Sequence, residues 1–108
     1  MTEAEFERLS VAMLARIAET LARNLGDIAE VDFQDGILTI VLEQGGTYVI
    51  NRHTPNRQIW LSSPRSGAAH YGFDAGSKAW IDTRSGRALA DVLGEELGPV
   101  ASGPLDFD

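Results

Sequence analysis

The chain has 108 residues, a formal net charge of −7 and no cysteine. This is the length of one domain, which buries roughly two thirds of the surface that its unfolded form exposes. Without cysteine the chain alone forms no disulfide, no thiolate nucleophile and no zinc site or iron-sulfur cluster with Cys ligands. The acidic charge disfavours nucleic-acid binding, which depends on Lys and Arg, so metal cations and basic protein surfaces are better partners.

The charge is unevenly distributed along the chain. Residues 1–50 carry nine acids against three arginines, and residues 74–108 carry seven acids against three bases. Residues 51–73 carry no acid and three arginines, Arg52, Arg57 and Arg65. The chain is thus acidic, then basic, then acidic, although composition alone favours plain solubility over any specific partner.

The first ten residues, MTEAEFERLS, are polar and acidic. They lack the basic and apolar regions of a secretory signal and the Arg-rich, acid-poor composition of a transit peptide. No stretch approaches the ~20 apolar residues that a membrane span needs. We therefore expect a cytoplasmic protein of bacterial source without a membrane partner.

Apolar residues recur at intervals of three and four between residues 3 and 25, which predicts one long amphipathic helix. Thr2 precedes this helix and Glu5 follows three residues later, the pattern of a capping box, and Gly26 is a stop signal. The apolar stripe consists of Phe6, Leu9, Met13, Ile17 and Leu21.

From residue 28 the apolar period changes to two, which predicts successive antiparallel strands. Asp35-Gly36 is a hairpin signal, and Gly, Pro and Asn mark further turns at residues 44–46 and 54–56. The expected strands are residues 28–34, 37–42, 47–53, 57–62, 70–73 and 79–83, with a loop at 63–67.

A second helix is indicated after Ser85, its candidate N-cap, and ends at Gly98-Pro99. Its apolar face consists of Leu89, Val92, Leu93 and Leu97. This order predicts an α+β two-layer sandwich, an antiparallel sheet of about five to six strands with the N- and C-terminal helices packed on one face. We expect a single domain over residues 1–98 and a loosely ordered tail over residues 99–108, where Leu105 and Phe107 are candidates to cover an apolar groove between the helix ends.

The second face of the sheet is left to meet water or a partner. Strand alternation assigns four apolar residues to the core side, Tyr48, Ile50, Ile59 and Leu61. Trp60 then lies on the solvent side with Asn51, Gln58 and Ser62. A large aromatic side chain among amides is typical of an interface hot spot, while a Trp simply packed under a loop fits the pattern alone equally well.

Residues 51–67, NRHTPNRQIWLSSPRSG, resemble the signature of the frataxin family almost position by position, and the preceding GTYVI matches as well. The resemblance extends to the first helix (residues 5–9), the second strand (36–40), Trp80, and the last helix (85–86 and 89–93). It covers nearly the whole chain, and its central block is highly specific. Frataxins have two helices on an antiparallel sheet, the layout derived above.

The resemblance implies that the exposed sheet face contacts a cysteine desulfurase and the scaffold protein of iron-sulfur cluster assembly. It assigns Asn51, Gln58 and Trp60 to that face and Pro64 to the adjoining loop. We add the basic residues of the segment, Arg52, Arg57 and His70, as candidate contacts. Many mitochondrial members have Arg at the position of His70 and Asp-Trp at residues 72–73, so the basic contact there is absent or pH-dependent in this chain.

The resemblance also implies an acidic ridge that binds ferrous or ferric iron weakly at the surface. Exposed carboxylates suit iron, and weak ligation suits a donor that must release it. Its candidate ligands are Glu3, Glu7, Glu19, Asp27, Glu30, Asp32 and Asp35. The ridge is thinner than in many relatives, and Arg16 and Arg23 at ion-pair spacing partly neutralise Glu19. Without the resemblance, such acids are more often a solvated turn and strand edge.

The leading hypothesis is a regulatory binding module, monomeric in the absence of iron, that meets the desulfurase complex through the Trp60 side of the sheet and offers or senses ferrous iron. An alternative is a ferroxidase that oxidises and stores iron, for which the sequence lacks the Glu-x-x-His pairs of di-iron proteins. His53 and His70 form no metal motif, because they lie on different strands without the close spacing of a helical two-histidine site. A third class is a protein-interaction domain without metal.

Overall fold

The computed structural model of the chain describes residues 1–107. Two helices enclose a run of six strands, as the sequence predicts. The elements are α1 (Glu3–Leu25), β1 (Ala29–Gln34), β2 (Ile37–Leu42), β3 (Thr47–His53), η1 (Thr54–Asn56), β4 (Gln58–Ser63), β5 (Gly67–Asp74), β6 (Ala79–Asp82), α2 (Leu89–Leu97) and η2 (Gly98–Val100).

Helix α1 begins with the capping box that the sequence predicts. The Thr2 side chain accepts a hydrogen bond from the backbone N–H of Glu5, and the Glu5 carboxylate accepts one from the backbone of Thr2. Two of the N–H groups that a helix start leaves unpaired are satisfied in this way. Four residues of the predicted apolar stripe are buried together with Leu14 and Leu25, and Leu9 is half-buried against the same core.

The six strands form one antiparallel meander in the order β1-β2-β3-β4-β5-β6. Asp35 and Gly36 form the two-residue turn between β1 and β2 with φ of 54° and 76°, the conformation that a tight hairpin requires. Strand β5 begins at Gly67, three residues earlier than expected, because Ser62 and Leu61 of β4 pair with Ala68 and Ala69. Alanine is a poor strand former by itself, so pairing with β4 decides this boundary.

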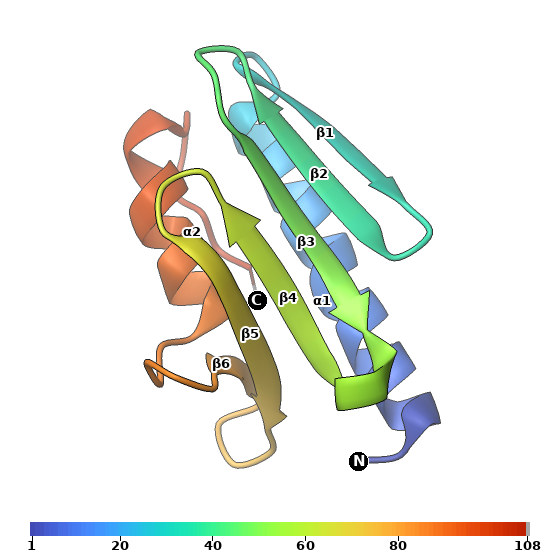
Figure 1. Cartoon of the computed structure of the whole chain (residues 1–108). Coiled ribbons are helices and arrows are strands. Elements are labelled where there is room, and N and C mark those ends of the chain that lie inside the picture. Colours follow the sequence, from blue (N-terminus) through green and yellow to red (C-terminus); the bar gives the residue numbers. More distant parts are fainter. Residues whose placement is uncertain (108) are drawn as a thin grey trace.

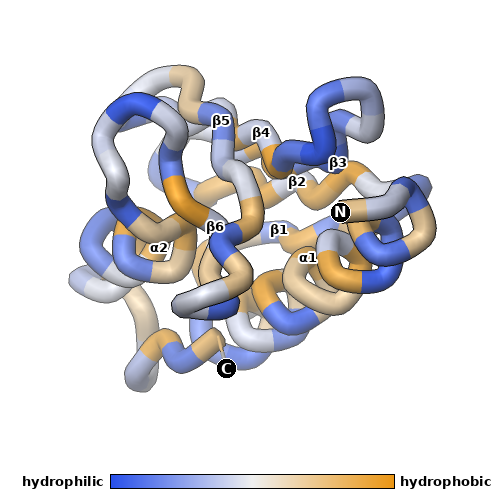
Figure 2. Tube along the Cα trace, turned by 90° about the horizontal axis from the view of Figure 1, so that it is seen from below, coloured by the Kyte–Doolittle hydropathy of each residue, from blue (hydrophilic) through white to orange (hydrophobic). Residues whose placement is uncertain are grey.

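The two helices cover one face of the sheet, and the other face is open (Figure 1). Figure 2 shows the two layers from below, with strands β2 to β5 above and the helices beneath. Tyr48, Ile50, Ile59 and Leu61 are 2% exposed or less and pack with the apolar faces of α1 and α2 in one core. The predicted α+β two-layer sandwich is therefore confirmed, and so is the orientation of its central strands.

Helix α2 starts later than the sequence suggests, and Ser85 is not its N-cap. Ser85 Oγ instead donates to Asp82 Oδ2 at 2.8 Å, in the turn that follows β6. Ala88 occupies the N-cap position with extended backbone and no side-chain hydrogen bond. The Asp82 carboxylate also accepts a hydrogen bond from the backbone N–H of Arg84 at 2.9 Å. These two bonds form a local turn, which holds Ser85 away from the start of the helix.

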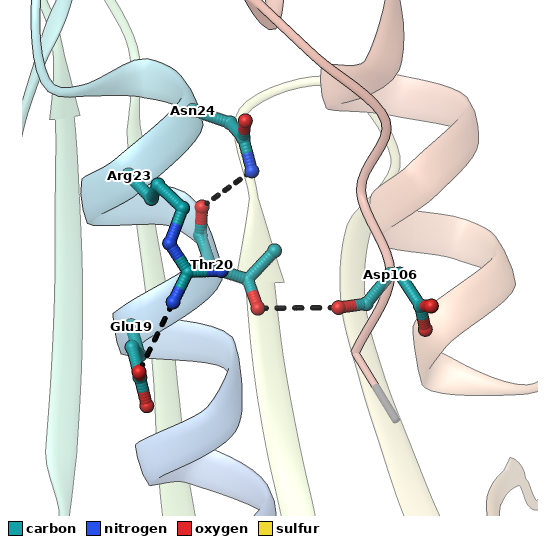
Figure 3. A network of polar contacts seen from close by, with 5 residues as sticks. All are labelled: Glu19, Thr20, Arg23, Asn24 and Asp106. Atoms are coloured by element: carbon teal, nitrogen blue, oxygen red, sulfur yellow. Dashed lines mark hydrogen bonds and ion pairs between the residues drawn. The ribbon is translucent and has the colours of Figure 1, made fainter.

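Residues 102–107 of the predicted tail pack along α1, and residue 108 lies outside the described residues. Ser102 N donates to Asn24 O at 2.9 Å, and Thr20 Oγ1 donates to Asp106 O at 3.3 Å (Figure 3). Phe107 is 4% exposed and belongs to the core, so it covers apolar surface as expected. Among residues 1–107 no helix combines the length and apolar content that crossing a bilayer requires.

Candidate partner-binding face and acidic edge

Trp60 lies half-buried near the middle of the open sheet face, between two histidine rings. The ring centroids of His53 and Trp60 are 3.6 Å apart with planes 7° from parallel, and those of Trp60 and His70 are 4.1 Å apart at 10°. The histidines come from β3 and β5, which flank β4, so each imidazole covers one face of the indole. We call His53, Trp60 and His70 the ring stack. The edges of the indole are left for contact with a partner.

Two amide side chains lie beside the ring stack. Gln58 shares the open side of β4, and its Oε1 accepts the indole N–H of Trp60 at 2.9 Å. Asn51 is the register partner of Trp60 on β3, and its Nδ2 donates to the carbonyl of Arg52 at 3.1 Å. The structure thus brings together four predicted face residues: Asn51, Gln58, Trp60 and His70. Stacking on both faces and a hydrogen bond hold the indole in one orientation, which lowers the entropy that binding would cost.

His53 is the face residue that the sequence interpretation missed. It lies two residues after Asn51, on the same side of β3, and is paired with Gln58. Strand alternation was the signal that could have placed it there.

Arg52 does not lie on the open face with the ring stack, and Arg57 lies in the connection between β3 and β4. Arg52 has the orientation of Ile50, toward the helices, and its Nη1 lies 3.5 Å from Glu7 Oε1 of α1. Arg57 adopts a left-handed backbone conformation with φ of 52°, and its Nη1 donates back to the carbonyl of Thr54 at 2.5 Å. The Arg52 guanidinium thus joins the sheet to α1, and the Arg57 guanidinium forms a hydrogen bond within the β3–β4 connection.

Pro64 is exposed in the turn between β4 and β5. Ser63 Oγ accepts hydrogen bonds from the backbone N–H groups of Arg65 and Ser66, both at 3.0 Å. A serine oxygen that accepts from amides two and three residues later folds the chain into a compact turn. The turn follows directly on the strand that carries Trp60, so Pro64 borders the open face.

The acidic residues of the predicted ridge fall into two groups. Glu7 and Glu19 of α1 are paired, with Arg52 and Arg23 respectively, and the Glu19–Arg23 distance is 3.1 Å (Figure 3). Arg16, the other expected partner of Glu19, donates instead to the carbonyl of Phe107 at 3.0 Å. Five candidate ligands form no ion pair among residues 1–107: Glu3, Asp27, Glu30, Asp32 and Asp35.

Asp27 and Glu30 line an open groove of about 420 Å³ where α1 ends and β1 and β2 meet. Its floor includes Val41 and Leu42, and Glu43 adds a third acid at the rim. Within the part of the chain that the structure describes, no three His, Asp or Glu side chains are placed to hold one metal ion.

Comparison with known protein families identifies the chain. The model of the frataxin-like domain matches residues 1–103. The chain belongs to the frataxin-like domain family. Among curated relatives, the iron-sulfur cluster assembly protein CyaY of Neisseria meningitidis serogroup B is 39% identical over 95% of the chain and 92% of the relative. The mitochondrial frataxin of Dictyostelium discoideum is 44% identical over 72% of the chain.

Solved structures of the family agree with the fold. The frataxin from Psychromonas ingrahamii superposes with a TM-score of 0.83 at 28% identity, over 100% of this chain and 99% of that one. A trimeric frataxin from Saccharomyces cerevisiae, in a ferrous complex, gives a TM-score of 0.69 at 34% identity over 95% of this chain and 88% of that one. The chain spans 40% of the length of the Dictyostelium frataxin and 59% of the Arabidopsis thaliana frataxin.

Proposed function

We propose that this chain is an accessory of iron-sulfur cluster assembly that binds a cysteine desulfurase with its scaffold protein through the ring stack and the adjoining amides. The observation that carries the proposal is a Trp held rigid on an otherwise open sheet face. Because the orientation of the indole is already fixed, a partner that contacts the ring stack pays little cost in side-chain freedom. Family membership, and similarity to relatives named iron-sulfur cluster assembly protein CyaY, support this class of function.

The first test is Trp60→Ala. Trp60 is half-buried on the open face, so the substitution should leave the circular dichroism spectrum unchanged while weakening desulfurase binding by at least ~1 kcal/mol, or about fivefold in Kd. The matched control is Val11→Ala, which removes an exposed apolar side chain from the opposite layer and should leave Kd unchanged. Equal affinity of wild type and Trp60→Ala in a calorimetric titration would refute this docking face.

We further propose that the acids around the groove at the end of α1 bind ferrous iron weakly. Asp27 and Glu30 are exposed and unpaired among the described residues and share a groove with Glu43. Few, flexible carboxylate ligands suit a metal that must be passed on. The family member in a ferrous complex supports iron as the cation.

A titration with ferrous iron under argon, followed by NMR, tests the iron proposal. We expect paramagnetic broadening to begin at residues 27–35 and to diminish in the double variant Asp27→Asn/Glu30→Gln. The control is Asp91→Asn, which removes an exposed acid from α2. Signals of residues 27–35 that stay unchanged at excess iron would favour the interaction domain without metal. Catalytic oxygen consumption on iron addition, above a buffer blank, would favour the ferroxidase.

A further inference from the structure

Glu96 lies in the last turn of α2, and its carboxylate accepts hydrogen bonds from three hydroxyl groups. Tyr48 Oη donates to Glu96 Oε1 at 2.8 Å, Ser63 Oγ to Oε1 at 2.6 Å, and Ser66 Oγ to Oε2 at 2.7 Å. Tyr48 belongs to β3, Ser63 ends β4, and Ser66 stands just before β5. One carboxylate therefore joins the end of a helix to three segments of the sheet layer.

The position of Glu96 is unfavourable for the helix itself. A negative charge in the last turn opposes the helix dipole, and α2 has no basic residue there. Burial raises the pKa of Glu96, but the hydrogen bonds from Ser63, Ser66 and Tyr48 together outweigh burial and leave the pKa below its ordinary value. The side chain is thus ionised at neutral pH, and its hydroxyl bonds are of the stronger, charge-assisted kind.

The Ser63 hydroxyl links Glu96 to the backbone of the β4–β5 turn. An ionised carboxylate has no proton to give, so Ser63 donates its single hydroxyl proton to Glu96. Its oxygen is then free to accept from the N–H groups of Arg65 and Ser66, both at 3.0 Å. The Arg65 side chain also contacts the end of α2, since its Nη1 donates to the main-chain carbonyl of Glu96 at 3.1 Å.

Pro64 lies between Ser63 and Ser66, the two turn residues whose hydroxyls donate to Glu96, and it is exposed. Gly46, with φ of 97°, is in the turn between β2 and β3. A Cβ at Gly46 would lie only 3.1 Å from Pro64 Cγ, so the two turns are in close contact. The hydrogen bonds to Glu96 therefore hold the turn on both sides of Pro64, and the contact with Gly46 limits the space around its ring.

We propose that Glu96 is a positioning residue for partner binding: its carboxylate holds the turn of residues 63–66, so that Pro64 has a fixed place at the end of β4, the strand that carries Trp60. The inference rests on the docking face proposed above. A turn that is already ordered avoids the entropy cost of ordering it on binding. Loss of the hydrogen bonds to Glu96 should therefore weaken the complex, although no residue of the ring stack is changed.

The test compares Glu96→Gln with Glu95→Gln. Both remove one negative charge from the last turn of α2, but Glu95 is exposed and pairs with Arg87, away from the turn. In Glu96→Gln one carboxylate oxygen becomes an NH₂ group, so at least one of the three hydroxyls loses its acceptor. We expect Kd for the purified desulfurase and scaffold to rise about fivefold to tenfold in Glu96→Gln and less than about twofold in Glu95→Gln.

A second readout reports on the turn itself. Trypsin cleavage after Arg65 in the native protein, followed by mass spectrometry, should be about fivefold faster in Glu96→Gln than in Glu95→Gln, because the bond is no longer held in a folded turn. Ser66→Ala, which removes one hydroxyl donor, should increase cleavage and Kd in the same direction and replaces Glu96→Gln if that variant fails to fold.

The comparison with Trp60→Ala separates the two proposals. Wild-type affinity or an unchanged cleavage rate in Glu96→Gln, together with weak binding of Trp60→Ala, would overturn the role of Glu96 and leave the docking face intact. Wild-type affinity in both variants would overturn both proposals. Weakened binding in both, with faster cleavage in Glu96→Gln and unchanged behaviour of Glu95→Gln, would establish the positioning role.

Discussion

Gln58 contributes to the candidate docking face through Trp60. The two side chains share one side of β4, and the Gln58 carbonyl accepts the indole N–H at 2.9 Å. The hydrogen bond fixes rotation of the indole within its plane, while the imidazoles of His53 and His70 restrict tilting. Gln58 therefore orients the ring in addition to offering its own amide to a partner.

Gln58→Ala should weaken desulfurase binding about threefold to fivefold and lower the melting temperature by no more than about 4 °C, since one half-exposed neutral hydrogen bond is worth about 1 kcal/mol or less. The measurement is a calorimetric titration beside a thermal melt. Ser62→Ala, an exposed position on the same side of the same strand, is the control. An equal loss of affinity in Ser62→Ala would mean that the effect is not specific to the orientation of Trp60.

The two helices differ in how they begin. Helix α1 has a complete capping box, whereas α2 starts at Ala88 with no side-chain hydrogen bond to its first turn. Ala88 already has the extended backbone that an N-cap residue needs, with φ of −79° and ψ of 142°. A side-chain oxygen at this position would reach the N–H groups of the first turn without backbone rearrangement.

Ala88→Ser should raise the free energy of unfolding by roughly 0.5–1 kcal/mol, because serine caps a helix start better than alanine. Urea denaturation measures the change. The matched variant Ala90→Ser places the same hydroxyl two residues later, past the N-cap position, and should give no comparable gain. Destabilisation by Ala88→Ser would indicate that contact with β6 at this residue outweighs capping.

Two tyrosines lie between the layers, and their surroundings favour the protonated form. Burial raises the pKa of Tyr48 to about 12, aided by the hydrogen bond to Glu96. Burial also raises the pKa of Tyr71 to about 12, aided by the charge of Asp82. Both side chains are at most 1% exposed and belong to the common core. An ionised tyrosinate in the core would lie against carboxylates and have little access to water.

Stability should therefore fall at alkaline pH. The folded chain retains both protons above pH ~10, where an unfolded tyrosine ionises, so this contribution is complete below pH ~10 and is lost as pH rises through 12. The chain has only two tyrosines, so near-ultraviolet tyrosinate absorbance reports on them alone. It should titrate near pH 12 in the native state, and Tyr48→Phe should halve its amplitude. Titration near pH 10 in a chain that is still folded would contradict the assigned environment.

The sequence by itself determined the order of the elements and the buried sides of the two helices, β3 and β4. Spacings of three and four residues in α1, and of two in β3 and β4, are local consequences of backbone geometry, so Ile59 was assigned to the core and Trp60 to the open face without knowledge of the neighbours. The Asp35-Gly36 hairpin and the capping box of Thr2 and Glu5 were equally local. The motif of residues 51–67 gave the family, which the match over residues 1–103 confirmed.

Only the tertiary structure decided which side chains meet. Strand register placed His53 and His70 on the two faces of Trp60, and layer packing paired Arg52 with Glu7. Glu96 reaches Tyr48 across 48 residues of sequence, a distance over which no periodicity carries information. The local sequence pattern fixes the direction of a side chain, while its partners depend on strand register and on packing between elements. The hydrogen bonds between Glu96 and the turn of residues 63–66 therefore could not be predicted from the sequence.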